Sequence, residues 1–113
     1  MDDDCLFCRI ARRDVPVPLV ASNALAVAFR DINPQAPVHV LIIPRAHIAS
    51  VLAATEPAHL EAVMQLATEV ARIEGVAESG FRIVLNTGAD GGQSVFHLHA
   101  HLLGGRAMDW PPG

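Results

Sequence analysis

Three histidines alternate with apolar residues in the stretch Gln93-Ser94-Val95-Phe96-His97-Leu98-His99-Ala100-His101-Leu102-Leu103. This alternation is the period of a β-strand, and it places His97, His99 and His101 on one face of a strand. Residues two apart on a strand lie about 6.5 to 7 Å apart, so the imidazoles form a row along which a phosphate-sized group can lie. Packing alone does not account for the row, because each buried imidazole brings ring nitrogens that need partners.

A glycine-rich loop, Asn86-Thr87-Gly88-Ala89-Asp90-Gly91-Gly92-Gln93-Ser94, precedes this strand. Glycine lets the backbone approach a ligand closely and turn its N–H groups inward, an arrangement that suits phosphate oxygens. By itself the loop is equally well a connection between two strands. Next to the histidine row, it indicates a phosphate-binding site.

The residue types in the row are suited to phosphoryl or nucleotidyl transfer. An imidazole nitrogen can attack phosphorus and form a phosphoramidate that water later cleaves. That nitrogen must be unprotonated, and the other ring N–H needs an acceptor that holds the tautomer. Neighbouring imidazoles can donate to phosphate oxygens and protonate the leaving group.

The length and composition of the chain limit its class. Its 113 residues are enough for one domain, residues 1–113, and 51% hydrophobic with 18% charged residues is typical of a folded globular protein. A net charge of −4 and the lack of a basic run longer than Arg12-Arg13 argue against a nucleic acid polymer as partner. No apolar stretch approaches the roughly 20 residues of a membrane span. The acidic start is unlike a signal peptide, so we expect a cytoplasmic protein.

The remaining pattern predicts an α+β fold, an antiparallel five-stranded sheet with one long and one short helix on one side of it. Asp4 is expected to cap the short helix, residues 5–13, and Thr55 the long helix that ends at Gly75. His59, in the first turn of the long helix, is expected on the solvated surface. The predicted strands are 19–21, 24–29, 38–43, 81–86 and the histidine strand, and the predicted buried helix face is Leu60, Val63, Met64, Ala67, Val70 and Ala71.

The chain resembles the histidine triad (HIT) superfamily, because His97-Leu98-His99-Ala100-His101-Leu102-Leu103 fits the signature His-φ-His-φ-His-φ-φ, where φ is apolar. Four further motifs resemble the Hint branch, the histidine triad nucleotide-binding proteins, and the likeness covers essentially the whole chain. These motifs are residues 90–95 with 103–106, Asp31-Ile32-Asn33-Pro34-Gln35-Ala36-Pro37, residues 39–48, and the ending Trp110-Pro111-Pro112-Gly113.

The resemblance implies roles for particular residues. His99, the middle histidine, would be the nucleophile that becomes nucleotidylated, with His101 and His39 at the phosphate. Asp31 would hold the ribose hydroxyls. Asn86, Gln93 and Ser94 are implied as further hydrogen-bonding partners, with Ser94 counted among the catalytic residues, and Gly92 and Val95 as nucleotide-binding residues. The purine pocket walls are implied to be Phe7, Ile10, Phe29 and Ile32.

Several functions remain open. Hint-like proteins hydrolyse purine nucleoside 5′-phosphoramidates or related aminoacyl adenylates to the monophosphate and an amine. The Ser94 that follows Gln93, together with the Trp110-Pro111-Pro112-Gly113 ending, favours this branch. The alternatives are a dinucleoside polyphosphate hydrolase, which shares the triad, and a nucleotide-binding adaptor protein. A catalytic metal is disfavoured, because no Asp or Glu flanks the triad strand as a second shell.

Cys5 and Cys8 form a C-x-x-C pair, which in a cytoplasmic protein indicates a metal site or a redox pair rather than a structural disulfide. The thiols lie one helical turn apart and can meet at one ion, but they supply only half of a tetrahedral zinc site. HIT relatives with this pair use a Cys₂His₂ set, so the resemblance implies a structural zinc on Cys5, Cys8, His47 and His97. It also implies a homodimer in which Trp110, in the tail, lies toward the partner's site.

Overall fold

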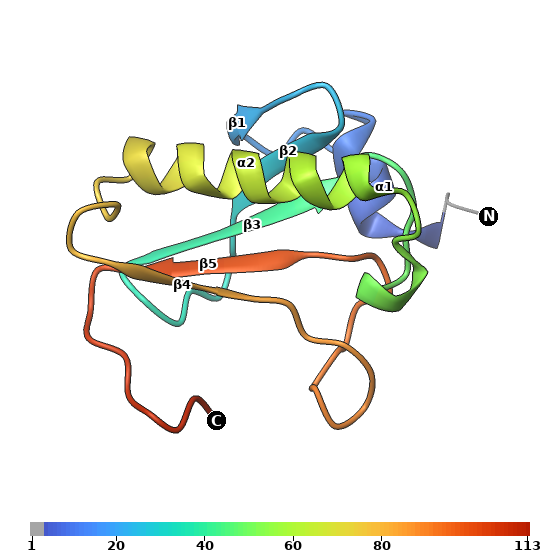
Figure 1. Ribbon diagram of the computed structural model, residues 1–113. Coiled ribbons are helices and arrows are strands. Elements are labelled where there is room, and N and C mark those ends of the chain that lie inside the picture. The colour runs from blue at the N-terminus through green and yellow to red at the C-terminus, as the bar shows by residue number, and fades with distance from the viewer. Residues whose placement is uncertain (1–3) are drawn as a thin grey trace.

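The computed structural model describes residues 4–113 and contains one open sheet with a helix on each face (Figure 1). Asp2 and Asp3, which belong to the acidic start on which the cytoplasmic expectation draws, lie outside this range. The predicted α+β fold is confirmed. In chain order the elements are α1 (Leu6–Ala11), β1 (Leu19–Ser22), β2 (Ala26–Arg30), β3 (Val38–Pro44), the short 3₁₀ helix η2 (Val51–Ala53), α2 (Pro57–Ile73), β4 (Phe81–Val84) and β5 (Ala100–Gly104).

The strand order is β1-β2-β3-β5-β4, and every neighbouring pair is antiparallel. This order places β5, which carries the last histidine of the row, between β3 and β4. Leu41 of β3 lies opposite His101 of β5, and His39 lies opposite Leu103. Because opposite residues share a face of the sheet, His39 and His101 project on the same side.

The two faces of the sheet carry different helices. Ala26 and Ala28 of β2 pack in the core beneath α2, whereas Val27 and Phe29 pack in a second core with α1. The expectation that both helices lie on one side was therefore wrong. The reason is that β2 and β3 are apolar on both faces, so each face needs its own cover.

Helix α2 differs from expectation at its start and along its exposed edge. Glu56 is the N-cap residue, without a side-chain cap bond, and Pro57 follows it, so Thr55 is not the cap. The buried stripe includes Ala62 and Leu66, while Met64, expected in the core, is 40% exposed. His59, expected on the solvated surface, is half-buried.

Two strands also have other bounds than the sequence predicted. β2 begins at Ala26 rather than at residue 24, because the Asn23 side chain accepts hydrogen bonds from the N–H groups of Leu25 and Ala26. β4 ends at Val84 rather than at residue 86. None of the helices in residues 4–113 has the length and hydrophobicity that crossing a lipid bilayer requires.

Candidate functional site

The histidine row enters the sheet through an irregular segment. β5 begins only at Ala100, so His97 and His99 precede the strand on which sequence had placed them. Pro44 at the end of β3 has no N–H to extend the ladder. Its carbonyl accepts instead from His97 Nε2 at 2.9 Å, and Leu98 N–H donates to the Ile48 carbonyl at 2.6 Å.

The alternation of faces nevertheless holds through this segment. Leu98, Ala100 and Leu102 are buried in the core beneath α2. On the other side, the rings of His99 and His101 lie 4.9 Å apart, centroid to centroid, and the Phe7 ring of α1 lies 5.9 Å from His97 and 5.3 Å from His99. The three imidazoles therefore gather on the face that α1 partly covers.

The tautomer of His99 follows from its one backbone partner. Its Nδ1 lies 2.9 Å from the carbonyl oxygen of His97, which can only accept, so Nδ1 carries the hydrogen. In the neutral ring, Nε2 then has the lone pair. A buried imidazole with this lone pair is an activated nucleophile of the kind that attacks phosphorus.

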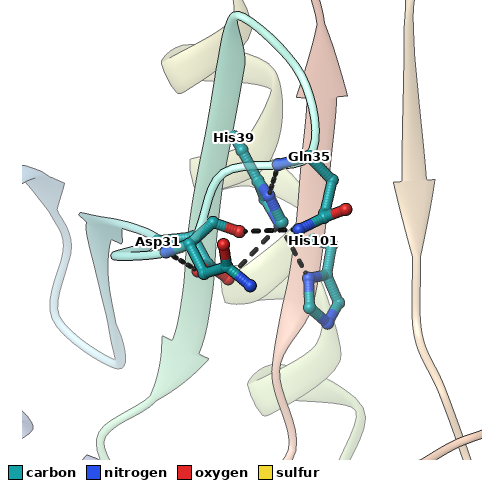
Figure 2. Close-up of polar contacts among 5 residues, drawn as sticks. Asp31, Gln35, His39 and His101 are labelled. Atoms are coloured by element: carbon teal, nitrogen blue, oxygen red, sulfur yellow. Dashed lines mark hydrogen bonds and ion pairs between the residues drawn. The ribbon is translucent and has the colours of Figure 1, made fainter.

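His101 takes part in a second chain of hydrogen bonds, drawn in Figure 2. The Gln35 backbone N–H donates to His39 Nδ1 at 3.0 Å, and His39 Nε2 lies 2.9 Å from His101 Nδ1. The Asp31 carboxylate is 3.4 Å from the same His39 Nε2. This arrangement brings a histidine from β3 and a carboxylate from the preceding loop to the triad.

Burial keeps both of these histidines neutral. The pKa of His101 is lowered from 6.5 to about 4, chiefly by desolvation and next by the neighbouring His99 and His39, while Asp31 opposes the shift. Burial also lowers the pKa of His39, again against the opposing charge of Asp31. At neutral pH, His101 is therefore a neutral donor or acceptor rather than a fixed positive charge.

Asp31, His39 and His101 bring three ligand-type atoms within 4.8 Å of one another, as a metal centre would. The hydrogen bonding of His39 argues against that use. Its Nδ1 accepts the Gln35 N–H, so a neutral ring carries its hydrogen on Nε2, the atom that faces the cluster. A metal there would require an imidazolate, so we assign this group to hydrogen bonding.

An apolar cavity of about 310 Å³ lies beside the triad, between α1 and the sheet. Its wall includes Phe7, whose ring contacts both Phe29 and His99 and so links the cavity to the histidine row. All of the predicted purine-pocket residues line it, with Asp31 at its polar edge, and Ile32 is fully exposed at its rim. The lining includes Leu6, Phe7, Ile10, Val15, Val17, Phe29, Asp31, Ile32 and Leu41.

The glycine-rich loop holds its own side chains in place. Gln93 Oε1 accepts from Gly88 N–H, and Gln93 Nε2 donates to the carbonyls of Ala49 and Val95. The Gln93 side-chain amide, which we expected at the phosphate, therefore stabilises the loop instead. Ser94 is exposed and, with Val95, lines a hollow of about 380 Å³ beside Cys5 and His47. Asn86 is half-buried just beyond β4, and Gly92 has a φ of +78° in the turn.

The two cysteines meet two histidines at the start of α1. Cys5, not Asp4, caps this helix, which spans only Leu6–Ala11, and its Sγ accepts from Cys8 N–H. His97 Nδ1 lies 3.3 Å from Cys5 Sγ and 3.4 Å from Cys8 Sγ, and His47 Nδ1 lies 3.2 Å from Cys8 Sγ. The four atoms all lie within 4.8 Å of one another.

This cluster fits a tetrahedral ion. Since His97 Nε2–H donates to the Pro44 carbonyl, the lone pair of Nδ1 faces the thiols, which is how a metal-ligating histidine is oriented. The N–S separations approach the roughly 3.6 Å edge of a tetrahedral zinc site with two thiolates and two imidazoles. The set is the one that the resemblance implied.

Leu41 and the Gln35 backbone N–H contribute to the site, and neither was predicted from the sequence. Leu41 alternates with His39 along a predicted strand, so the period-2 pattern could have placed it on the site face. The Gln35 backbone N–H had no such signal, because it reaches His39 only through the fold of the loop before β3.

Comparison with known proteins shows similarity along nearly the whole chain. The HIT domain family model matches residues 12–108. A 14 kDa zinc-binding protein of Zea mays is 46% identical over 116 residues, covering 99% of this chain and 90% of that protein. A purine nucleoside phosphoramidase of Escherichia coli is 44% identical over 110 residues, covering 96% and 92%. The crystal structure of a HIT family hydrolase from Legionella pneumophila has a TM-score of 0.91 at 47% identity, covering 96% and 99%.

Proposed function

This chain belongs to the HIT domain family, and we propose that it hydrolyses purine nucleoside 5′-phosphoramidates or aminoacyl adenylates to the monophosphate and an amine. The observation that carries the proposal is the Nδ1–H of His99 on the His97 carbonyl, which leaves the lone pair on Nε2 of a ring that contacts Phe7 in the wall of the apolar cavity. The Escherichia coli relative named a purine nucleoside phosphoramidase supports the substrate class.

In the proposed reaction, His99 Nε2 attacks the α-phosphorus and the bond from phosphorus to the leaving group breaks. His101 Nε2–H donates a hydrogen bond to the phosphate oxygens, and the departing nitrogen, or the departing oxygen of an adenylate, takes up a proton from water. The His97 carbonyl stabilises the positive charge that develops on the His99 ring. Water then attacks the nucleotidyl-His99 intermediate, its proton passes to the solvent, and the monophosphate is released with His99 neutral again.

The binding elements divide between the cavity and its edge. The purine would lie among Phe7, Ile10, Phe29 and Ile32, and the Asp31 carboxylate would accept hydrogen bonds from the ribose hydroxyls. His39 and His101 would lie at the phosphate. The loop, whose shape Gln93 holds, would supply the remaining contacts through Asn86, Gly92, Ser94 and Val95.

A substrate panel tests the assignment. Turnover of AMP-morpholidate and AMP-NH₂ well above that of diadenosine polyphosphates is the expected result. Faster cleavage of the dinucleotides would reassign the protein to polyphosphate hydrolysis. Tight AMP binding without turnover of either class would favour the nucleotide-binding adaptor.

We further propose that Cys5, Cys8, His47 and His97 hold a structural zinc ion, which would stabilise the contact between α1 and the segment before β5. The orientation of His97 and the name of the Zea mays relative support this. The ion would take no part in the reaction, because His97 faces it while His99 and His101 face the substrate.

We also propose a homodimer. β4 is the last strand of the sheet, and its outer edge is free to pair in residues 4–113. Met64 and Ile73 of α2 are exposed apolar side chains that a second copy could cover. In one chain, the Arg82 guanidinium lies 5.9 Å from the centre of the Trp110 ring, which remains 82% exposed and available to a partner.

A further inference from the structure

His39 is held by the backbone in a way that determines which of its nitrogens carries hydrogen. The Gln35 N–H donates to His39 Nδ1 at 3.0 Å, and a backbone N–H cannot reverse its role. The neutral His39 ring must therefore carry its hydrogen on Nε2. Both atoms near Nε2, the Asp31 carboxylate oxygen and His101 Nδ1, are able to accept it.

The hydrogen on His39 Nε2 also determines the tautomer of His101. His39 Nε2 lies 2.9 Å from His101 Nδ1, so a hydrogen on the former requires a lone pair on the latter. A neutral His101 then carries its own hydrogen on Nε2, on the side of the ring away from His39 (Figure 2). One backbone N–H thus determines the tautomer of an imidazole two hydrogen bonds away.

The loop that supplies this N–H is hydrogen-bonded to the segment that follows β5. Arg106 Nε donates to the Gln35 carbonyl at 3.2 Å. Gly105, with a φ of +88°, lets the two segments approach, because a Cβ there would lie only 2.9 Å from Pro37 Cβ. Within the loop, Asn33 N–H donates to Asp31 Oδ1 and Gln35 Nε2 donates to the Asn33 carbonyl.

We propose that the Gln35 backbone N–H and the Arg106 side chain are positioning groups that set, through His39, the nitrogen from which His101 donates its hydrogen. The catalytic meaning rests on the proposed function, in which His101 Nε2–H donates a hydrogen bond to the phosphate oxygens. With the opposite tautomer, a lone pair of His101 would face the negative phosphate oxygens, and the ring would offer them no hydrogen bond.

The first test needs no variant. Long-range ¹⁵N–¹H spectra of the ligand-free protein distinguish Nδ1–H from Nε2–H imidazoles. The expected result is Nε2–H for both His39 and His101, and Nδ1–H for His99 as an internal contrast. A His101 that carries its hydrogen mainly on Nδ1 would overturn the proposal whatever the protein's activity.

The second test removes the donor. Gln35→Pro lacks the N–H, while Gln35→Ala keeps it and loses only the side-chain contact with Asn33. In the proline variant we expect His101 to become a mixture of tautomers, and kcat for AMP-morpholidate to fall about tenfold with KM little changed. The alanine variant should keep the Nε2–H spectrum of His101.

A third variant guards against misfolding of Gln35→Pro. Arg106→Ala should raise the Nδ1–H fraction of His101 and lower kcat about threefold, less than the loss of the N–H itself. Arg45→Ala is the matched control, since Arg45 also donates to a backbone carbonyl, that of Asn23, but at the opposite end of β3. Wild-type tautomers in Arg106→Ala and in a folded Gln35→Pro would sink the proposal. Wild-type protein with the expected tautomers but no turnover would instead count against the proposed function alone.

Discussion

His99 and His101 lie two residues apart, yet their ring nitrogens have opposite partners. His99 Nδ1 donates to a carbonyl, whereas His101 Nδ1 faces the Nε2–H of His39. Each ring therefore presents a different group from its other nitrogen, a lone pair from His99 and a hydrogen from His101. Two identical side chains can thus serve as nucleophile and as hydrogen-bond donor to the phosphate in one proposed reaction.

The assignment of His99 as nucleophile is tested by its removal. His99→Gly should lower turnover of AMP-morpholidate at least about a thousandfold, because no other nitrogen is placed to form the covalent intermediate. AMP binding, followed by calorimetry, should persist, since the cavity wall is formed by other residues. Near-normal turnover in this variant would rule His99 out. Mass spectrometry of acid-quenched wild-type reactions should show AMP attached to His99.

The lowered pKa of His101 predicts a pH dependence of stability. Between pH of about 4 and 6.5, an unfolded His101 binds a proton that the folded one does not, so stability rises with pH through this window. The contribution is complete above pH 6.5 and is lost as the pH falls toward 4. An NMR titration should give a His101 midpoint near 4, and a midpoint near 6.5 would contradict the burial argument.

Thermal unfolding provides the second readout for this residue. From pH 7.5 to pH 5, Tm should fall less in His101→Asn than in wild type, because asparagine does not titrate. Acid loss of any metal affects both proteins alike, so the difference between them reports His101 itself.

At the scale of elements, α1 is short and is held from two directions. Phe7 and Ile10 pack in the core with β2 and β3, and the cysteines at its start contact His47 and His97. Six residues form too short a helix to be stable alone. Its position, and with it one wall of the cavity, therefore depends on these tertiary contacts.

Removal of the thiols tests this dependence. Wild-type protein purified without chelator should contain about one zinc per chain by elemental analysis, and Cys5→Ser/Cys8→Ser none. The variant should have a lower Tm and weaker AMP affinity, because α1 carries Phe7 into the cavity wall. A metal-free wild type would refute the zinc proposal. Chelation of the wild type should reproduce the loss of Tm without any substitution.

The turn after β5 is a second element under constraint. Gly105→Ala combines a left-handed backbone with a contact of 2.9 Å to Pro37 Cβ, so it should lower the free energy of unfolding by about 2 to 4 kcal/mol. Gly88→Ala is the control, since Gly88 has a φ of +72° with no atom within 4 Å of the added Cβ. Gly88→Ala should lower the free energy of unfolding only by the backbone strain, about 1 to 2 kcal/mol. If urea denaturation gave the two variants equal losses in the free energy of unfolding, the approach of Gly105 to Pro37 would not be tight.

At the scale of the whole molecule, the proposed dimer predicts a light-scattering mass near twice the 12.0 kDa of one chain at micromolar concentration. Its physical basis is the free edge of β4 together with the apolar side chains left exposed on α2. A monomer under these conditions would exclude the dimer and, with it, a role for Trp110 toward a partner's site.

The sequence alone determined the local features. Period-2 alternation placed Leu98, Ala100 and Leu102 opposite the histidines, and period-3.6 spacing predicted α2 within a few residues, because both periods depend on neighbouring residues only. Where a strand begins depends on its neighbour, so β5 starts three residues later than the pattern suggested. The assignment of His47 and His97 to the cysteine pair came from the family resemblance, not from spacing.

Tertiary structure decided which distant groups meet and in what protonation. His39 reaches His101 across 62 residues of sequence and Cys5 reaches His97 across 92, contacts that exist only because β3 and β5 pair and α1 folds onto the second face. The side of the sheet that α1 covers was predicted wrongly, since β2 is apolar on both faces and its sequence does not tell which helix covers which face. A tautomer depends on the partner of each nitrogen, and backbone partners such as the Gln35 N–H and the His97 carbonyl leave no mark in the identity of a side chain.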